Sequence, residues 1–522
     1  MASVPGTDTA VMPLPGSLLV GLYFVLLVCL SVYGAHRAYL LYLYTRYRPR
    51  RPAARVDGDD DTPFVTVQLP VYNELYVVER LIDAAARLDY PPQRLEIQVL
   101  DDSTDETQRI AAAAVARWSA RGVAIRRLHR AERTGYKAGA LAAGLRAARG
   151  EAIAIFDADF IPPRDFLRRA LPALREPGVG LVQARWGHVN RECSWLTRVQ
   201  ALLLDAHFVL EHGARNRGGC FFNFNGTAGV WRRAAIDDAG GWQPDTLTED
   251  LDLSYRAQLA GWRFVFLPDL VAPAELPVEM NAFKTQQHRW AMGSIQTCLK
   301  VLPPVLRSGL PLRLKAEAFF HLTANFNYPL LLLASVLMVP ALFVRALAGS
   351  QTLLLVDVPL FCAAALSMVN FYAVSQRAVR RDWLSQLRYV PLAIAVGIGL
   401  SVNNTRAVLG ALRRARPRFV RTPKYGVVGR RDEWRTKRYR PAVAGQPFVE
   451  LALGLYFTLA VLGAASSALF AAVPLLCVFQ FGFLYMGVVS LLQQPRPDRA
   501  GVSRARPAMA GVAGKRRGAS PA

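Results

Sequence analysis

The sequence predicts an α/β domain inserted between transmembrane α-helices, and three observations lead to this prediction. Residues 61–311 alternate short apolar segments with helical ones, as in domains built around a parallel sheet. Apolar segments long enough to cross a bilayer precede and follow this region. Arginines gather beside those apolar segments, which is the usual pattern on the cytoplasmic side of a membrane protein.

The N-terminal part, residues 17–45, is predicted to be an uncleaved transmembrane helix with its N-terminus outside. Residues 18–35 are apolar, and tyrosines and then arginines follow them. A cleaved signal peptide would carry its basic residues before the apolar segment, not after it.

The central α/β region contains four predicted strands. They cover residues 64–69, 95–100, 123–128 and 153–156, and helices are predicted between them, from 75–88 and from Lys137 onward. This alternation predicts a parallel, doubly wound sheet, and the domain is expected to cover residues 61–311.

Four further spans are predicted after this domain, at residues 318–344, 353–374, 448–465 and 469–492. They define two pairs of transmembrane helices, in residues 312–376 and 447–493. A shorter apolar segment, 390–402, is followed by Asn403. As a full span it would place one of two basic loops outside, whereas as an interfacial helix it leaves both inside. We therefore predict five spans, an interfacial helix and a loop in residues 377–446, and a basic, disordered tail in 494–522.

The net charge of +24 raises nucleic acid as a partner. Much of the excess lies beside apolar segments, and no stacked-aromatic or groove-binding pattern accompanies it, so no nucleic-acid partner is predicted. The expected location is the plasma (inner) membrane, crossed several times, with the α/β domain in the cytoplasm. The six cysteines have no metal-ligand spacing, so neither a zinc site nor disulfides are predicted.

Two acids end the fourth predicted strand and form the first candidate site. Asp157 and Asp159 stand at its carboxyl end, where open α/β sheets bind ligands. Two hard oxygen donors this close suit Mg²⁺ or Mn²⁺, with the remaining ligands supplied by phosphates. A capped turn is the alternative explanation.

Other strand ends carry polar residues suited to a nucleotide. Pro70 and Glu74 follow the first strand, and Asp101 and Asp102 end the second, where they could accept hydrogen bonds from a base or ribose. Ordinary turn chemistry could explain each feature taken alone.

Glycines and cations at residues 133–139 open the next helix. Arg133 and Lys137 suit a diphosphate at the N-terminus of this helix. Together with the acids of the fourth strand, these residues predict a site for a nucleotide diphosphate and a metal ion.

Thr248-Glu249-Asp250 precedes a predicted helix over residues 251–260. Either Glu249 or Asp250 could act as the general base that takes a proton from an acceptor hydroxyl. The alternative is a helix cap with acids in the first turn.

Before the second membrane part, residues 286–290 combine donors with an aromatic face. Trp290 offers a stacking platform for a sugar, and Gln286, His288 and Arg289 offer hydrogen-bond donors to hydroxyls or phosphate. An amphipathic interfacial helix would carry similar residues and is the alternative.

In order along the chain, these motifs resemble the D, DxD, TED and QxxRW motifs of processive family 2 glycosyltransferases, which include cellulose and hyaluronan synthases. Residues 224–232 and 275–277 resemble in particular the cellulose synthase-like mannan and glucan synthases. The resemblance implies a GT-A domain, Rossmann-like and binding nucleotide sugars. It also implies that Asp102 and Lys137 bind nucleotide, that Asp159 with Asp157 binds metal, and that Asp250 is the base. Arg289 and Trp290 would hold the diphosphate and the acceptor.

A later segment, residues 419–424, is similar to the gating loop of bacterial cellulose synthase, FxVTxKG. Phe419, Thr422 and Lys424 match it, whereas Arg421 replaces the valine and Tyr425 separates the lysine from Gly426. A lid over a bound diphosphate is expected. A basic loop that only touches anionic lipid is the alternative.

By this resemblance the chain is a membrane-embedded, inverting hexosyltransferase that forms a β-linked glucan or mannan. Its expected partners are a UDP- or GDP-hexose donor, a growing glycan or lipid acceptor, and membrane lipid. A non-processive enzyme that makes a glycolipid is the nearest alternative. A transporter with a nucleotide-binding domain is less favoured, because the predicted spans carry few charges.

Overall fold

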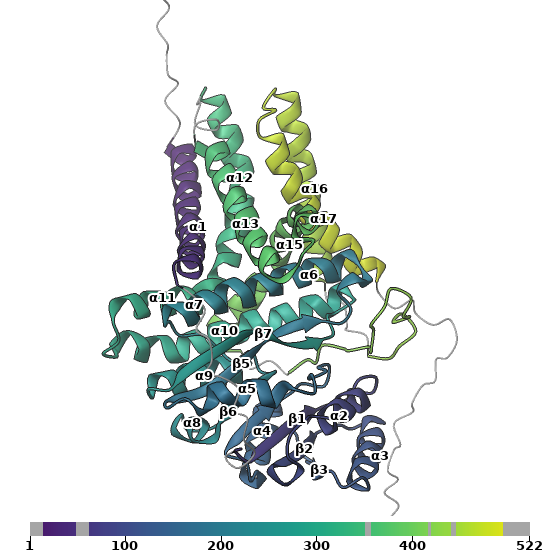
Figure 1. Cartoon of the computed structure of the whole chain (residues 1–522). Coiled ribbons are helices and arrows are strands. Elements are labelled where there is room, and N and C mark those ends of the chain that lie inside the picture. The colour runs from purple at the N-terminus through teal and green to yellow at the C-terminus, as the bar shows by residue number, and fades with distance from the viewer. Residues whose placement is uncertain (1–13, 48–61, 350–355, 416–418, 440–444, 494–522) are drawn as a thin grey trace, which may run out of the picture.

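The computed structural model describes residues 14–47, 62–349, 356–415, 419–439 and 445–493. Its elements form three tiers (Figure 1). Long apolar helices project from one side, a tier of helices lies across their base, and the sheet domain lies beneath. The projecting helices are α1 (Leu14–Arg46), α12 (Asn327–Leu347), α13 (Val358–Val379), α16 (Gln446–Ser466) and α17 (Val473–Leu492). The middle tier contains α6 (Trp195–Ala206), α10 (Met280–Arg307) and α11 (Leu312–Thr323).

The sheet has seven strands in the order β3-β2-β1-β4-β6-β5-β7. The first four are β1 (Val65–Val71), β2 (Leu95–Asp101), β3 (Ile125–His129) and β4 (Ala152–Ile155), which confirms the four predicted strands to within two residues at their ends. The other three are β5 (Val179–His188), β6 (Gly229–Arg232) and β7 (Arg263–Ala274).

The prediction of a wholly parallel sheet is wrong. Strands β1 to β4 pair in parallel, but β6 runs antiparallel to both β4 and β5. Strand β6 is only four residues long, too short to show a periodicity from which its direction could be predicted. The sheet is therefore mixed, with a parallel half that carries the early motifs.

Helices cover both faces of the sheet. One apolar core lies between the sheet and α2 (Val78–Ala86), α3 (Thr107–Ser119) and α5 (Phe166–Arg175). The other lies between the sheet and α4 (Tyr136–Ala147), α8 (Arg233–Asp238) and α9 (Glu249–Leu259). All residues of β2 are buried, as expected for an inner strand covered on two faces. Polar groups at the strand ends are thereby held on a rigid frame.

Five helical segments of the described chain are long and apolar enough to cross a membrane: Leu14–Arg46, Leu312–Leu347, Trp383–Leu412, Gln446–Ser466 and Val473–Leu492. Four of them coincide with predicted spans. The predicted span at 353–374 falls partly on residues outside the described chain, and the rest lies in α13, which packs against α1.

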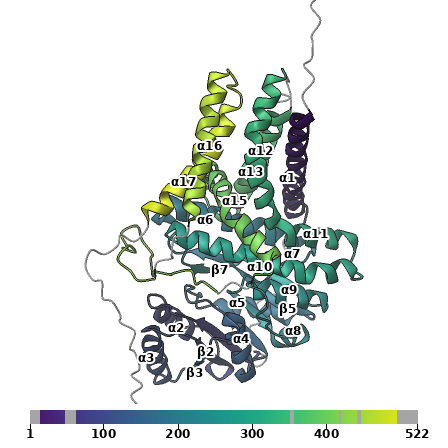
Figure 2. The ribbon, with the colours of Figure 1, turned by 180° about the vertical axis from the view of Figure 1, so that it is seen from behind.

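The fifth segment includes α15 (Val390–Leu412), which is longer than predicted because the helix continues past Asn403. Both of its ends lie against the middle tier. Tyr389, just before α15, receives a hydrogen bond from Arg198 of α6, and Ala407, Val408 and Ala411 pack against α10. In both views α15 lies near the base of the projecting helices (Figure 2).

Charged residues of the projecting helices form buried ion pairs, although the sequence indicated only that the predicted spans carry few charges. Glu450 of α16 lies 2.5 Å from the amino group of Lys284 in α10. Arg345 near the end of α12 lies 2.6 Å from Asp357. Each pair joins helix ends, which suits a structural tie between elements better than a transport path.

Candidate active site

One cavity lies between the carboxyl ends of β1, β2 and β4 and the helix α10, and most of the predicted site residues line it. The sequence-predicted residues in its lining are Pro70, Glu74, Asp102, Arg133, Lys137, Asp157, Asp159, Glu249, Asp250, Gln286, Arg289, Trp290, Phe419, Thr422 and Lys424. The topology explains this convergence, since the carboxyl ends of parallel strands meet at one edge of a sheet.

The two acids after β4 each contact a lysine. Asp157 Oδ1 lies 2.6 Å from Lys137 Nζ, and Asp159 Oδ2 lies 2.7 Å from Lys424 Nζ. Burial raises the pKa of Asp157, although Lys137 opposes that effect. Each of the two carboxylates is thus held by an ammonium group that also lines the cavity.

A divalent cation fits the chemistry of these two acids. Within the described chain no three His, Cys, Asp or Glu side chains gather as a metal site. Two carboxylates supply only part of an octahedral oxygen shell, which suits Mg²⁺ or Mn²⁺ when phosphate and water oxygens complete it. Asp157 and Asp159 are therefore suited to a cation that arrives with a diphosphate.

Aromatic and cationic groups form the wall beside β1 and β2. The Arg133 guanidinium lies 3.5 Å from the centre of the Tyr72 ring. Arg130 Nε donates to Asp102 Oδ1 at 2.8 Å, so Asp102 is already held by a cation of its own domain. Gly135, at φ 72°, precedes α4 in the left-handed conformation that glycine adopts readily. This turn directs Lys137 into the cavity.

Asp101 does not line the cavity. It is fully buried, lies 2.7 Å from Arg127 Nε and accepts a hydrogen bond from the backbone N–H of Ser103. It differs from Asp102 because successive side chains of a strand point to opposite faces. The predicted ligand role of Asp101 is therefore replaced by a structural one.

The acids in the first turn of α9 face the cavity, and Thr248 does not cap the helix. The Thr248 hydroxyl lies 3.1 Å from that of Thr297 in α10, and no side-chain cap bond forms at this position. A Cβ atom on Gly293 of α10 would lie 2.6 Å from Thr248 Cγ2, so α10 approaches this turn closely. The contact fixes the position of the two acids that follow.

Asp250 has the electrostatic environment of a base that works near neutral pH. Burial and then the neighbouring Glu249 carboxylate raise the pKa of Asp250 to about 7. Asp250 Oδ1 accepts the backbone N–H of Leu251 at 2.8 Å. Burial also raises the pKa of Glu249, whose Oε1 lies 4.0 Å from Lys137 Nζ.

Helix α10 presents Gln286, Arg289 and Trp290 to the cavity, as their spacing of three and four residues along one helix face predicts. Trp290 lies 6.4 Å from Trp186, ring centre to ring centre. His288 falls outside the cavity lining. Its Nδ1 lies 3.3 Å from the Asn403 carbonyl oxygen of α15. The predicted role of His288 in binding is thus replaced by a contact between helices.

Residues 419–426, here called the cover segment, contribute Phe419, Arg421, Thr422 and Lys424 to the cavity lining. Phe419 stacks on Tyr136, with ring centres 5.6 Å apart, and the Arg289 guanidinium lies 4.8 Å from the Phe419 ring. Thr422 is 4% exposed, and its hydroxyl lacks a hydrogen-bond partner among the described residues. The three gate-like residues therefore line the same cavity as the acids.

Two acids contact the cover segment, and only one of them, Glu74, was predicted as a site residue. Glu275, quoted only as part of a resemblance, accepts the backbone N–H groups of Tyr425 and Gly426, both at 2.8 Å. Glu74 lies 3.5 Å from Arg421, and burial raises the pKa of Glu74 to about 8. Arg421, the position that departs from the gating motif, thus contacts the cavity wall.

Comparisons with known proteins agree with this geometry. Residues 63–293 match the family described as "Glycosyltransferase like family 2". This match confirms the resemblance to family 2 glycosyltransferases that the motifs indicated.

Among curated proteins, the chain is 43% identical over 295 residues to Glucomannan 4-beta-mannosyltransferase 2 of Arabidopsis thaliana, covering 54% of this chain and 55% of that protein. It is 44% identical over 256 residues to Glucomannan 4-beta-mannosyltransferase 1 of Oryza sativa subsp. japonica, covering 48% and 49%. The chain therefore spans about half the length of these relatives.

Among solved structures, the chain is similar to the mannosyltransferase PcManGT from Pyrobaculum calidifontis in complex with GDP-Man and Mn²⁺. The TM-score is 0.51 at 24% identity, with 76% of this chain and 99% of that chain covered. This likeness concerns the fold, and the GT-A prediction is confirmed.

Proposed function

We propose that the chain is a membrane-embedded, inverting glycosyltransferase that moves a hexose from a nucleotide diphosphate sugar onto a β-linked glycan. One observation carries the proposal. A single cavity joins an acid pair suited to a diphosphate-bound cation, a carboxylate with a pKa near neutral, and an Arg–Trp pair on α10.

Mannose is the sugar that the comparisons favour. The curated relatives are named 4-beta-mannosyltransferases, and the solved structure contains GDP-Man and Mn²⁺. We propose GDP-mannose as the donor and Mn²⁺ or Mg²⁺ as the cation. UDP-glucose and GDP-glucose are the competing donors, because the motifs themselves do not select the sugar or the base.

The residues of the cavity define the transfer step. The acceptor hydroxyl gives its proton to Asp250, and the acceptor oxygen forms a bond to the anomeric carbon while the bond from that carbon to the diphosphate oxygen breaks. Attack opposite the leaving group inverts the anomeric centre and yields a β-linkage from an α-linked donor. Lys137 and Arg289 lie where they would hold the departing nucleoside diphosphate.

Asp157 and Asp159 would hold the cation. When bound, such a cation neutralises charge on the leaving diphosphate. Trp290 and Trp186 would offer apolar faces to the acceptor sugar, and the cover segment would exclude water from the diphosphate.

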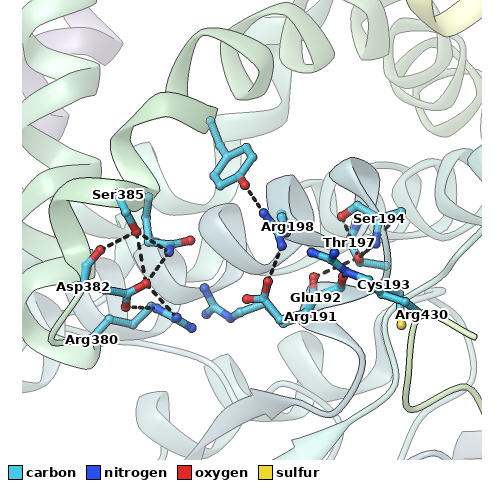
Figure 3. A network of polar contacts seen from close by, with 12 residues as sticks. Arg191, Glu192, Cys193, Ser194, Thr197, Arg198, Arg380, Asp382, Ser385 and Arg430 are labelled. Atoms are coloured by element: carbon cyan, nitrogen blue, oxygen red, sulfur yellow. Dashed lines mark hydrogen bonds and ion pairs between the residues drawn. The ribbon is translucent and has the colours of Figure 1, made fainter.

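We also propose that the catalytic domain and every basic loop lie on the cytoplasmic side of a plasma (inner) membrane. Figure 3 supports one element of this arrangement. The segment 191–198, which includes the start of α6, contacts the chain on both sides of α15, since Arg198 donates to Tyr389 and the Glu192 carbonyl accepts from Arg430 at 2.7 Å. An interfacial α15 keeps both contacts on one side of the membrane.

Tags at residues 385 and 430 should both be protected from outside reagents in intact cells, and external labelling of either tag would contradict this topology.

The direct test uses purified protein in lipid with Mn²⁺ or Mg²⁺ and a panel of labelled nucleotide sugars. Transfer from GDP-mannose into a β-linked product supports the proposal, and the length of the product separates a polymer from a glycolipid. Absence of transfer from every donor would overturn it.

A further inference from the structure

Asn225 lies in the cavity lining and has an amide whose two ends differ in their contacts. Its Nδ2 lies 3.0 Å from Nε2 of His207. Its Oδ1 has no hydrogen-bond partner among the residues that the structure describes. A half-buried amide with one end fixed and the other end unpaired is suited to receive a ligand hydroxyl.

The contact that the other ring nitrogen of His207, Nδ1, makes with Glu211 explains the orientation of the Asn225 amide. His207 begins η3 (His207–His212), a π-helical turn between α6 and α7 (Gly213–Gly218), and its Nδ1 lies 2.9 Å from Glu211 Oε2. Burial opposes ionisation of Glu211, but the hydrogen bond from His207 and the Arg215 charge hold the pKa of Glu211 well below its usual range. Glu211 therefore accepts only, and Nδ1 of His207 carries the proton.

The amide nitrogen of Asn225 lies against Nε2 of His207 and can only donate, so Nε2 presents a lone pair. That lone pair accepts a hydrogen bond from the amide NH₂ of Asn225, so the amide nitrogen faces His207 and the carbonyl oxygen faces away from it. Glu211 and His207 thus set which end of Asn225 is available to the cavity. Single π-helical turns are frequent at functional sites, which agrees with this arrangement.

The location of Asn225 indicates which ligand it would meet. A Cβ atom added to the adjacent Gly226 would lie 2.9 Å from Asp250 Oδ2 and 3.3 Å from Lys137 Nζ. On the other side, Phe208, next to His207, packs against Trp186 at 5.2 Å. Asn225 is therefore adjacent to a residue that faces the proposed base, and its partner His207 is adjacent to a residue that packs against Trp186.

We infer that Asn225 determines acceptor binding by accepting a hydrogen bond from a hydroxyl of the acceptor sugar, and that His207 and Glu211 are positioning residues that orient its amide. This inference rests on the proposed function. It adds a polar contact to the acceptor subsite that we propose at Trp186 and Trp290.

The test compares four single variants under saturating GDP-mannose, with β-1,4-linked mannotetraose as the variable acceptor. Asn225→Leu removes the amide at constant size, and His207→Phe removes the lone pair that orients it. His207→Gln keeps an acceptor oxygen on a side chain of similar reach. His212→Phe is the matched control, because His212 belongs to the same turn but its Nε2 faces the Asn223 carbonyl.

We expect Asn225→Leu and His207→Phe each to raise the acceptor KM about tenfold, the equivalent of one hydrogen bond. The GDP-mannose KM should stay within about twofold of wild type, since the nucleotide wall is untouched. His207→Gln should recover most of the acceptor affinity, and His212→Phe should alter thermal stability without altering the acceptor KM.

The outcomes separate this inference from the proposed function. Wild-type protein that transfers no sugar from any donor fails the proposed function itself. Active wild-type protein with an unchanged acceptor KM in Asn225→Leu overturns the inference alone. A His212→Phe variant that matches His207→Phe also overturns it, because general loosening of η3 would then explain both. If His207→Phe does not fold, Asn225→Leu still decides, since it leaves η3 unchanged.

Discussion

The two walls of the cavity are built in different ways. One wall, called the donor wall because we propose that the donor binds there, comes from residues 65–159, and charged groups such as Asp102 are fixed within the sheet domain, in this case by Arg130. The opposite wall is assembled from α9, α10 and the cover segment, which are far apart in the sequence. Its contacts join separate elements, such as Lys424 to Asp159 and Glu275 to the backbone of the cover segment. Donor binding should therefore depend on the first wall, and transfer on the assembly of the second.

The largest expected effect comes from Asp250→Asn, which should lower the transfer rate about a thousandfold because a positioned base is lost. Donor affinity should stay near that of wild type, since the role that we propose for Asp250 is toward the acceptor hydroxyl and not toward the nucleotide. Initial rates of labelled sugar incorporation, together with equilibrium binding of the donor, would measure the two quantities separately.

Glu249→Gln is the matched control for this base. It changes the adjacent carboxylate, which shares the buried environment of Asp250. A smaller loss is expected from this variant. Should Asp250→Asn keep its turnover while Glu249→Gln loses it, the base must be reassigned to Glu249.

Asp159→Ala tests the point where the walls meet, because Asp159 follows β4 and contacts Lys424 of the cover segment. Loss of a cation that neutralises the leaving group should cost several kcal/mol, about a hundredfold or more in rate. Nucleotide binding should also lose its dependence on Mn²⁺ or Mg²⁺, which calorimetry with and without chelator would measure. Full activity of wild-type protein in chelator would exclude a metal role for this pair.

The sequence predicted the donor wall better than the opposite wall, for a physical reason. Apolar strands that end in acids are local patterns, so β1, β2 and β4 were predicted correctly, and most of the predicted residues at their ends line the cavity. Strand β6 is too short to show a pattern, and nothing in residues 274–277 indicates that Glu275 holds Tyr425 and Gly426. Such contacts depend on tertiary packing, which also turned Asp101 and His288 away from the cavity.

Variants in and beside the cover segment distinguish a lid over the diphosphate from a loop that only contacts lipid. Lys424→Ala and Thr422→Ala should each slow transfer, Lys424→Ala by about thirtyfold, because a charge-assisted contact to the acid pair is removed. Arg430→Ala and Arg431→Ala should change the rate less than twofold, since both side chains are exposed and lie beyond the cavity lining. The reverse order of effects in lipid-reconstituted protein would favour the lipid contact.

The pH dependence of transfer should report the buried base. With the pKa of Asp250 raised to about 7 by burial and by Glu249, the carboxylate forms as pH rises through that value. The rate should therefore increase about tenfold between pH 6 and pH 8, following the ionised fraction of one such group. An acidic limb near pH 4 would mean that the environment of Asp250 in the working enzyme does not raise its pKa.

The smallest kinetic effect is expected from Asp101→Asn. This variant tests whether Asp101 has a structural role while its neighbour Asp102 contacts the nucleotide. Asp101 is buried and lies 2.7 Å from Arg127, whose side chain is 24% exposed. The asparagine can still accept the backbone N–H of Ser103, but the ion pair is lost, so the free energy of unfolding should fall by about 1–2 kcal/mol. The donor KM and kcat should stay within about twofold of wild type, because Asp101 does not reach the cavity. Thermal unfolding and steady-state kinetics measure the two effects on the same preparation. A selective loss of donor affinity with unchanged stability would mean that Asp101, like Asp102, contributes to nucleotide binding.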